Sequence, residues 1–471
     1  MGRGFAGILV LVALLCTGAA SAPTFTRANH TLVMGDGVSL AATLFAPDGA
    51  PPSGGWPGVL LLHGLGADRS QVNALAEQHL APYGYAVLTV DARGHGASGG
   101  RSTLDGPREI ADYAAALNWL RARPGVNDAK IGAIGFSLGG AAVWKLLTAP
   151  GTRLAAAVPA ITWTSLYDAL LPQSFAKAGL FAYLRMLLPE GHWDPAVTAA
   201  GEDAVLGRNL PRVAEFARER SVRNDLGKIR TPVFMLQGRR DYAFDLDQAL
   251  SAFARLRGPK RLYLGDLGHP PASNPPAEVS YYATKAREWL DAYLKGGAKP
   301  ASAIELARDP WKGTVVYPKQ PARRVLRLRF RGAKTMAAGG KALRSTERTR
   351  RLNETFGTPL AAVKVSSSTR WPHLVAVLSA VTPSGEEIVV SQGGTATPTL
   401  SARPRLVTIR MLSQATTIPR GSRLRLTIAG TSTAQSPANL LYPISVPSEA
   451  KVRIGEAKVV LPVLKRPISR Q

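Results

Sequence analysis

Short apolar runs alternate with longer stretches at helical spacing throughout residues 59–300. Neighbouring parallel strands need a long crossover between them, usually a helix, and strands covered on both faces are apolar along their whole length. The alternation therefore predicts an α/β fold, a doubly wound and mostly parallel sheet covered by helices. We expect buried strands at 59–62, 86–90, 131–136, 154–158, 233–236 and 261–264. Crossover helices are expected at 70–80, 107–121, 138–148, 245–256 and 277–294. We also expect two antiparallel strands, at 31–33 and 39–45, as the first strands of the sheet.

One long segment interrupts this rhythm. Between 159 and 228 the sequence has helical spacing at 175–188 and 210–219 but no clear strand. Loops of this length without secondary structure are rare in compact domains. We therefore predict a helical lid insertion over about 160–228 that roofs the functional site.

The apolar period changes after residue 300. Alternating apolar and basic residues at 325–331 indicate a half-buried strand, and further strand-like runs at 374–381, 405–412, 422–428 and 451–461 are separated by Gly, Pro, Ser and Thr. The chain is thus expected to contain an α/β domain over 23–300 and a C-terminal all-β sandwich over 301–471. Residues 334–351 are crowded with cations and small residues, and we expect them to form a long mobile loop.

The first 22 residues have the three parts of a secretory signal peptide: Arg3, an apolar stretch at 5–15 and small residues at 20–22. The apolar part is too short to span a bilayer comfortably, and no later run is long enough. The one cysteine, Cys16, lies in this segment, so the mature chain cannot form a disulfide. We expect a secreted or cell-envelope-associated protein without a transmembrane span, cleaved after position 20 or 22.

Positive charge is concentrated in the second half of the chain. Residues 301–471 contain 28 Lys and Arg against eight Asp and Glu, which accounts for +20 of the formal net charge of +26. Clustered cations bind polyanions by releasing their counterions, but a solvated basic face also keeps a protein soluble. Binding to an anionic cell-envelope surface and simple solvation both remain open, and the predicted export argues against nucleic acid as a partner.

The sequence GFSLG at 135–139 directly follows a predicted strand and directly precedes a predicted helix. A serine at such a sharp turn has a strained backbone that exposes its hydroxyl, and Gly135 and Gly139 avoid side chains that would collide there. The N-terminus of the following helix favours negative charge that develops during attack. These features predict that Ser137 is a nucleophile.

A serine hydroxyl needs a base to accept its proton, and the base needs a carboxylate to orient it. Three histidines follow Ser137 in the chain, and two of them, His192 and His373, fall in the predicted lid and the β-rich domain. His269 comes after the last predicted strand of the sheet, where the carboxyl ends of the strands meet. We therefore predict His269 as the base.

The acid is expected at the same edge of the sheet. Asp241 follows the predicted strand at 233–236 by a few residues, which places its carboxylate at the carboxyl end of the sheet. Asp266 is near His269 in sequence and is the alternative acid. Asp241 is the preferred interpretation.

An oxyanion hole needs two hydrogen-bond donors. One is expected to be the backbone N–H of Leu138, directly after the nucleophile, and the other that of Leu65 in the loop HGLG at 63–66. His63 is then structural. The seven histidines show no paired metal-ligand spacing and the chain has no glycine-rich dinucleotide loop, so we expect neither a metal nor an organic cofactor.

Five motifs in this order resemble the α/β-hydrolase superfamily: HGLG at 63–66, DARGHGAS at 91–98, GFSLG at 135–139, GRRD at 238–241 and GH at 268–269. The segments ITWTSLYDAL at 161–170, VAVLSAVTPSGEE at 375–387 and IPRGSRLRLTIAGTS at 418–432 are similar to the X-prolyl dipeptidyl peptidase and cocaine esterase family. That resemblance implies a jelly-roll C-terminal domain. The family usually has a tyrosine after its nucleophile and a tyrosine hydroxyl in its oxyanion hole, whereas this chain has Leu138 and the HGLG loop.

These features predict a secreted serine hydrolase that cleaves carboxylic esters of small acyl substrates through an acyl-enzyme. No acidic pair can be assigned to binding the free amino terminus of a peptide, so an X-prolyl dipeptidyl peptidase is the first alternative. A non-catalytic envelope-binding protein on a hydrolase scaffold is the second. The acyl chain, the leaving group and the oligomeric state are not predicted.

Overall fold

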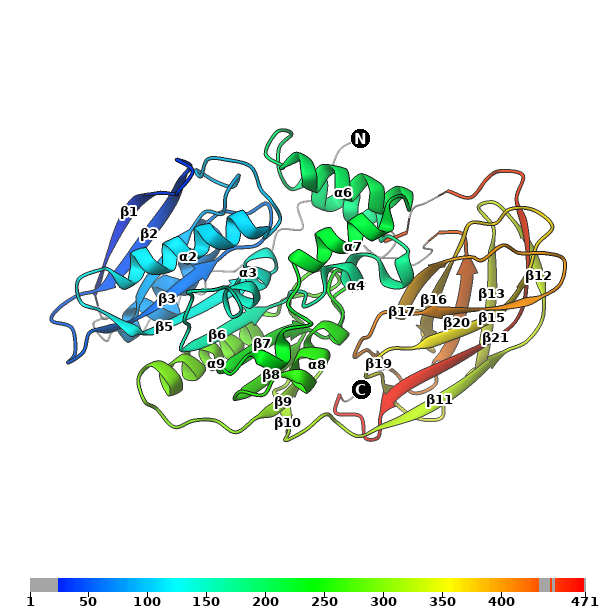
Figure 1. Cartoon of the computed structure of the whole chain (residues 1–471). Helices are drawn as coiled ribbons and strands as arrows, with labels where there is room; N and C mark the ends of the chain where they lie inside the picture. Colours follow the sequence, from blue (N-terminus) through cyan, green and yellow to red (C-terminus); the bar gives the residue numbers. More distant parts are fainter. Residues whose placement is uncertain (1–23, 432–440, 443–444, 470–471) are drawn as a thin grey trace.

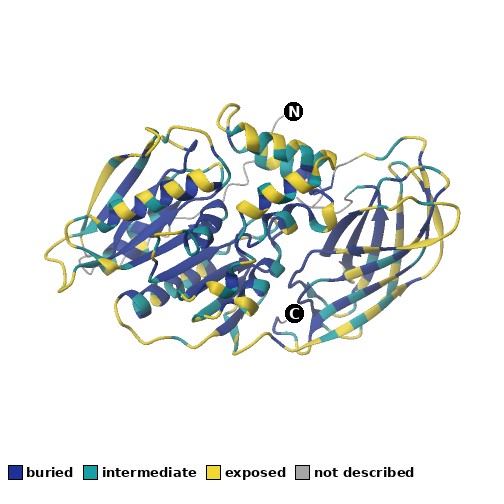
Figure 2. Ribbon diagram, in the orientation of Figure 1, coloured by how far each residue is buried: buried dark blue, intermediate teal, exposed yellow. Residues whose placement is uncertain are grey.

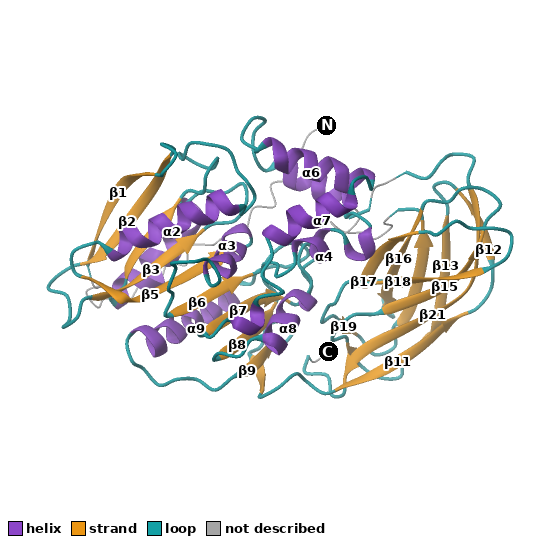
Figure 3. Ribbon diagram, in the orientation of Figure 1, coloured by secondary structure: helices purple, strands orange, loops and turns teal. Residues whose placement is uncertain are grey.

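A computed structural model of the chain describes residues 24–431, 441–442 and 445–469. The predicted signal peptide, with Cys16, lies outside these residues. No helix in the described part of the chain is long and apolar enough to cross a membrane. Figure 3 shows one part in which helices surround a sheet and a second part built of strands.

The first part is organised around a ten-stranded sheet of order β1-β2-β4-β3-β5-β6-β7-β8-β9-β10 (Figure 1). The pairings from β4 through β3, β5, β6, β7 and β8 to β9 are parallel. The hairpin β1–β2 pairs antiparallel with β4 at one edge, and β10 pairs antiparallel with β9 at the other. The strands are β1 Phe25–Val33, β2 Ser39–Pro47, β3 Trp56–Leu62, β4 Ala86–Val90, β5 Val126–Phe136, β6 Ala156–Ala160, β7 Val233–Gly238, β8 Lys260–Gly265, β9 Ala303–Ala307 and β10 Thr314–Tyr317.

Helices cover both faces of this sheet and bury its central strands (Figure 2). One apolar cluster joins the sheet to α2 (Pro107–Arg121), α3 (Leu138–Leu146) and α8 (Leu246–Arg255). A second cluster joins the opposite face to α1 (Ser70–Leu75) and α9 (Pro276–Leu294). The predicted doubly wound α/β architecture, followed by a β-rich domain, is thus confirmed.

The sheet does not end at residue 300, where we predicted the domain boundary. Strand β9 pairs in parallel with β8, and β10 pairs with β9, so the sheet continues to Tyr317. All five residues of β9 are buried, as in the inner strands. The boundary at 300 was wrong because the change of period begins only after this last buried strand.

The insertion between β6 and β7 contains four α-helices: α4 Leu166–Leu170, α5 Ala178–Met186, α6 Pro195–Leu206 and α7 Leu210–Glu219. Their apolar faces pack together and onto the loops after β3 and β7. Figure 1 shows these helices between the sheet and the C-terminal domain. Phe175, just before α5, stacks on Tyr442 and His373 of that domain.

The C-terminal domain consists of antiparallel sheets around one apolar core. One sheet has the order β11-β21-β15-β18, with β12 also pairing with β21, the other has the order β13-β20-β16-β17, and β14 pairs with β19. The strands are β11 Arg323–Phe330, β12 Lys334–Ala337, β13 Lys341–Arg348, β14 Asn353–Glu354, β15 Leu360–Ser366, β16 His373–Val381, β17 Glu387–Ala396, β18 Arg405–Arg410, β19 Thr417–Ile418, β20 Arg423–Ala429 and β21 Lys451–Leu464.

The predicted long loop at 334–351 was wrong, because this segment forms β12 and β13. In β13, an edge strand paired with β20, Ala342 is buried while Lys341 and Arg348 are exposed. Charged residues are common on the outer positions of edge strands, where they oppose further pairing. The cations therefore lie at the solvent-facing positions of an edge strand and do not indicate disorder.

Candidate active site

Ser137 occupies the turn between β5 and α3. Its backbone has φ +53° and ψ −112°, outside the regions that L-residues ordinarily adopt. A Cβ on Gly135 would lie 2.1 Å from the carbonyl oxygen of Gly139, and one on Gly139 would lie 2.6 Å from that of Leu62. The turn therefore requires both glycines, as the motif predicted.

His269 lies in the loop after β8 with its ring between Ser137 and Asp241. Its Nε2 is 3.0 Å from Ser137 Oγ, and its Nδ1 is 2.8 Å from Asp241 Oδ2. Since a carboxylate only accepts hydrogen bonds, the proton of the neutral ring is held on Nδ1, and Nε2 is free to accept from the serine hydroxyl. The structure thus brings together the three side chains selected from the sequence.

Asp241 is held by its own loop. The side chain is fully buried, and its Oδ1 accepts hydrogen bonds from the backbone N–H groups of Ala243 and Phe244 at 2.8 and 2.9 Å. The ring of Phe244 also packs edge-on against the imidazole of His269, with centroids 5.2 Å apart. The carboxylate and the imidazole therefore have little freedom to turn away from each other.

Lys177, at the start of α5, supports this loop from the lid. Its Nζ donates to the carbonyl oxygens of Tyr242 and Ala243 at 2.8 and 3.1 Å. Burial lowers the pKa of Lys177 to about 8, partly offset by the nearby carboxylates of Asp245 and Asp241. No sequence signal marks this residue, because it is 64 positions from Asp241 and belongs to the insertion.

The two predicted oxyanion donors border Ser137. Leu138 is the first residue of α3, and a Cβ on Gly64, next to Leu65, would lie 3.5 Å from Ser137 Cβ. Neither the N–H of Leu65 nor that of Leu138 has a hydrogen-bond partner among the described residues. Both amides are thus available to a bound oxyanion.

His63 orients the backbone N–H of Leu65. Its Nε2 accepts the N–H of Ala92 at 2.9 Å, so Nδ1 carries the proton and donates to the carbonyl oxygen of Gly64 at 2.7 Å. Because the peptide is planar and trans, fixing the Gly64 carbonyl directs the Leu65 N–H to the opposite side. Burial lowers the pKa of His63, which keeps the ring neutral.

The alternative candidates lie elsewhere. Asp266 accepts a hydrogen bond from Arg240 at 2.9 Å and another from Ser273, and it is not bonded to His269. His192 contacts the carbonyl oxygen of Gly94, and His373 stacks on Phe175. Within the described ranges, no cluster of three His, Cys, Asp or Glu side chains could hold a metal ion.

Comparisons with known proteins agree with this architecture. The model of the family described as X-Pro dipeptidyl-peptidase (S15 family) matches residues 36–271, half of the chain. A curated relative, thiohydrolase aneE of Aspergillus aculeatus, is 26% identical over 271 residues, which cover 50% of this chain and 83% of that protein.

Solved structures share the fold over nearly the whole chain. A CocE/NonD family hydrolase from Staphylococcus aureus aligns with a TM-score of 0.71 at 15% identity, covering 93% of this chain and 94% of that one. An α-amino acid ester hydrolase aligns with a TM-score of 0.71 at 15% identity, covering 96% and 98%. At 15% sequence identity, this structural similarity shows that the three chains share a fold.

Proposed function

The chain is a hydrolase of the X-Pro dipeptidyl-peptidase (S15) family, and we propose that it cleaves carboxylic esters through a Ser137–His269–Asp241 triad. The observation that carries this proposal is the continuous hydrogen-bonded array from Ser137 Oγ through His269 to Asp241. It has the geometry that activates a serine hydroxyl.

In the proposed mechanism, Ser137 Oγ attacks the acyl carbonyl carbon while His269 Nε2 takes the hydroxyl proton. The carbonyl oxygen becomes an oxyanion and accepts hydrogen bonds from the N–H groups of Leu65 and Leu138. The C–O bond to the alcohol then breaks, and His269 returns the proton to the leaving oxygen. Water attacks the acyl-enzyme by the same route, which releases the acid and restores Ser137.

The family also supports an X-prolyl dipeptidyl peptidase. Such an enzyme must bind the free amino terminus of its peptide, which calls for unpaired carboxylates near the nucleophile. Asp241 is instead engaged by the His269 ring and three backbone amides, and Asp266 by Arg240 and Ser273. These pairings favour ester cleavage.

The test is a substrate panel combined with labelling of the serine. We expect the purified protein to hydrolyse p-nitrophenyl acetate and to react with a fluorophosphonate at the peptide that contains Ser137. Ser137→Ala is expected to lose the labelling and at least 10³-fold in kcat, because no other group supplies the nucleophile. Ser345→Ala, an exposed serine on β13, is the matched control and should keep both.

The same panel separates the alternatives. Faster turnover of an X-Pro-p-nitroanilide than of any ester would identify a dipeptidyl peptidase, and faster turnover of a thioester would match the activity named for the Aspergillus relative. Ester hydrolysis that survives Ser137→Ala would overturn the proposed mechanism.

A further inference from the structure

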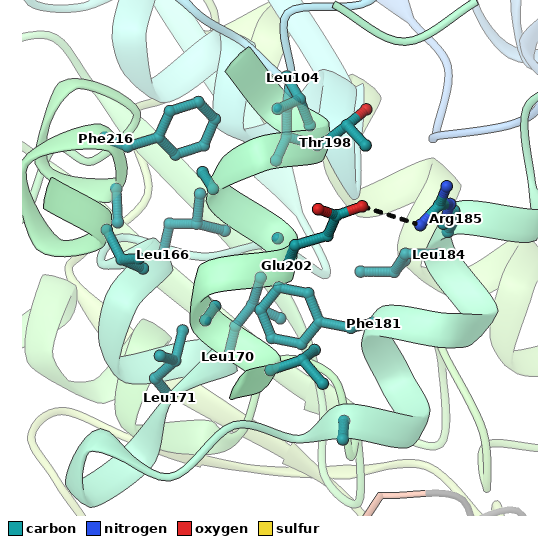
Figure 4. A pocket seen from close by; sticks show the side chains of 18 of the residues that line it. Leu104, Leu166, Leu170, Leu171, Phe181, Leu184, Arg185, Thr198, Glu202 and Phe216 are labelled. Atoms are coloured by element: carbon teal, nitrogen blue, oxygen red, sulfur yellow. Dashed lines mark ion pairs between the residues drawn. The ribbon is translucent and has the colours of Figure 1, made fainter. Parts of the chain in front are cut away.

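A cavity of about 350 Å³ lies inside the helical insertion. Its volume is within the range of small-molecule binding sites. Residues of α4, α5, α6 and α7 line it, together with Leu104 before α2 and Leu65 after β3 (Figure 4). The insertion thus encloses a space instead of only covering the sheet.

The wall of this cavity is almost entirely apolar. Figure 4 shows Leu166, Leu170, Phe181 and Phe216 around it, with a dashed line that joins Glu202 to Arg185. These two residues are its only charged lining side chains among those described, and they form an ion pair at 3.7 Å. Their side chains are 65% and 55% exposed, so the pair lies where the cavity meets solvent.

The cavity begins at the proposed oxyanion loop. Leu65, whose N–H is a proposed oxyanion donor, contributes to the cavity wall. Leu138, directly after the nucleophile, belongs to the same apolar cluster as the lining residues Leu166 and Leu170. An acyl carbon bonded to Ser137 Oγ, with its oxygen on the Leu65 amide, therefore has this cavity beside it for the rest of the acyl group.

We propose that the cavity binds the hydrocarbon chain of a medium-chain fatty acyl ester. This inference deepens the proposed ester hydrolysis and rests on it. An uncharged chain gains free energy by leaving water for the apolar wall. An α-ammonium group would be desolvated there without a free carboxylate, because Glu202 is already paired with Arg185.

The first experiment measures kcat/KM for p-nitrophenyl esters from acetyl to dodecanoyl, below their aggregation concentrations. Burial of each methylene should raise kcat/KM about two- to fourfold up to about octanoyl. A value that is flat or falls from acetyl onward would overturn the cavity assignment while leaving ester hydrolysis in place. Absence of turnover on every ester, with no labelling of Ser137, would instead refute the proposed function.

A matched pair of variants on α6 tests whether the increase of kcat/KM with acyl chain length depends on this cavity. Ala200 lines the cavity, whereas the adjacent Ala199 is exposed. We expect Ala200→Phe to lower the ratio of kcat/KM for the octanoyl ester to kcat/KM for the acetyl ester at least tenfold. Ala199→Phe should leave this ratio unchanged. Equal losses on both esters, or no loss on the octanoyl ester, would contradict the assignment.

A replacement variant and a second type of substrate complete the test. If Ala200→Phe does not fold, Gly201→Phe replaces it, since a Cβ on Gly201 would have only Phe181 Cδ1 nearby, at 3.8 Å. The 2-aminooctanoyl ester should be a poorer substrate than the octanoyl ester by tenfold or more. A preference for the amino ester would show that the site is built for aminoacyl groups and would overturn the proposal.

Discussion

Asp241 presents its two oxygens to different partners. Oδ1 accepts two backbone N–H groups at 2.8 and 2.9 Å, and Oδ2 faces Nδ1 of His269 at 2.8 Å and the backbone N–H of His269 at 3.4 Å. In an Asp241→Asn variant, the amide oxygen must take the Oδ1 position, because an NH₂ group there would oppose two donors. The NH₂ group then faces His269, and the ring can accept its hydrogen bond only by moving its own proton to Nε2.

We therefore expect Asp241→Asn to lower kcat by about 10³- to 10⁴-fold, since a histidine protonated on Nε2 cannot accept the serine proton. Steady-state hydrolysis of a p-nitrophenyl ester measures this loss, and circular dichroism checks that the variant is folded. Asp266→Asn tests the alternative acid and should stay within about tenfold of the wild type. A larger loss in Asp266→Asn than in Asp241→Asn would reverse the assignment.

Among the secondary-structure elements, the junction of β5 and α3 leaves no room for larger residues at either of its two flanking glycines. A Cβ on Gly135 would meet backbone atoms of the first turn of α3, and a Cβ on Gly139 would meet backbone atoms at the end of β3, not flexible side chains that could move aside. The N–H of Ser137 is bonded to the carbonyl oxygen of Ala160 in β6, and that of Gly139 to the carbonyl oxygen of His63 after β3. The strained serine is thus anchored to both neighbouring strands.

Gly135→Ala should therefore destabilise the fold by about 2–4 kcal/mol, because overpacking against a fixed backbone forces the turn to shift. Urea unfolding followed by circular dichroism gives the free energy of unfolding. Gly227→Ala is the control: a Cβ there meets nothing within 4 Å, and it should change stability by less than about 0.5 kcal/mol. Equal stability of the two variants would mean that the turn can relax around a methyl group.

At the scale of the whole molecule, a buried ion pair joins the two domains beside the active site. Arg239, two residues before Asp241, pairs with Glu354 of β14, and both side chains are fully buried. Arg239 also donates to the carbonyl oxygens of Ala415 and Ala307 at 2.7 and 2.6 Å. The C-terminal domain therefore contributes to holding the loop that carries the proposed acid.

Glu354→Gln is expected to lower the free energy of unfolding by about 3–5 kcal/mol, because it leaves Arg239 buried without a countercharge. Urea unfolding measures this change. Glu215→Gln breaks the exposed Glu215–Arg218 pair and should cost less than about 1 kcal/mol. If both substitutions lower the free energy of unfolding by the same small amount, the Arg239–Glu354 pair does not stabilise the fold.

Much of the architecture was predictable because its signals are local. Strand β4 and helices α2 and α7 have the predicted bounds, and other elements differ by a few residues at their ends. Strands β9, β10, β12 to β15, β17 and β19, and helices α4 and α6, were not predicted. In α6, apolar and small residues occur on all sides of the helix, so no amphipathic period marks it.

Local patterns along the chain were enough to predict the alternation of strands and helices, the glycine-flanked serine at a strand end, and the family, because each depends on neighbouring residues. Export rests on residues 1–22 and remains a prediction. The packing of distant elements was needed to show which acid faces His269, that Lys177 supports the loop of that acid, that Arg239 and Glu354 join the domains, and that the insertion surrounds an apolar cavity. The paired side chains among these features are 28 to 115 positions apart, and the distances between them follow from how whole elements pack, which no local pattern encodes.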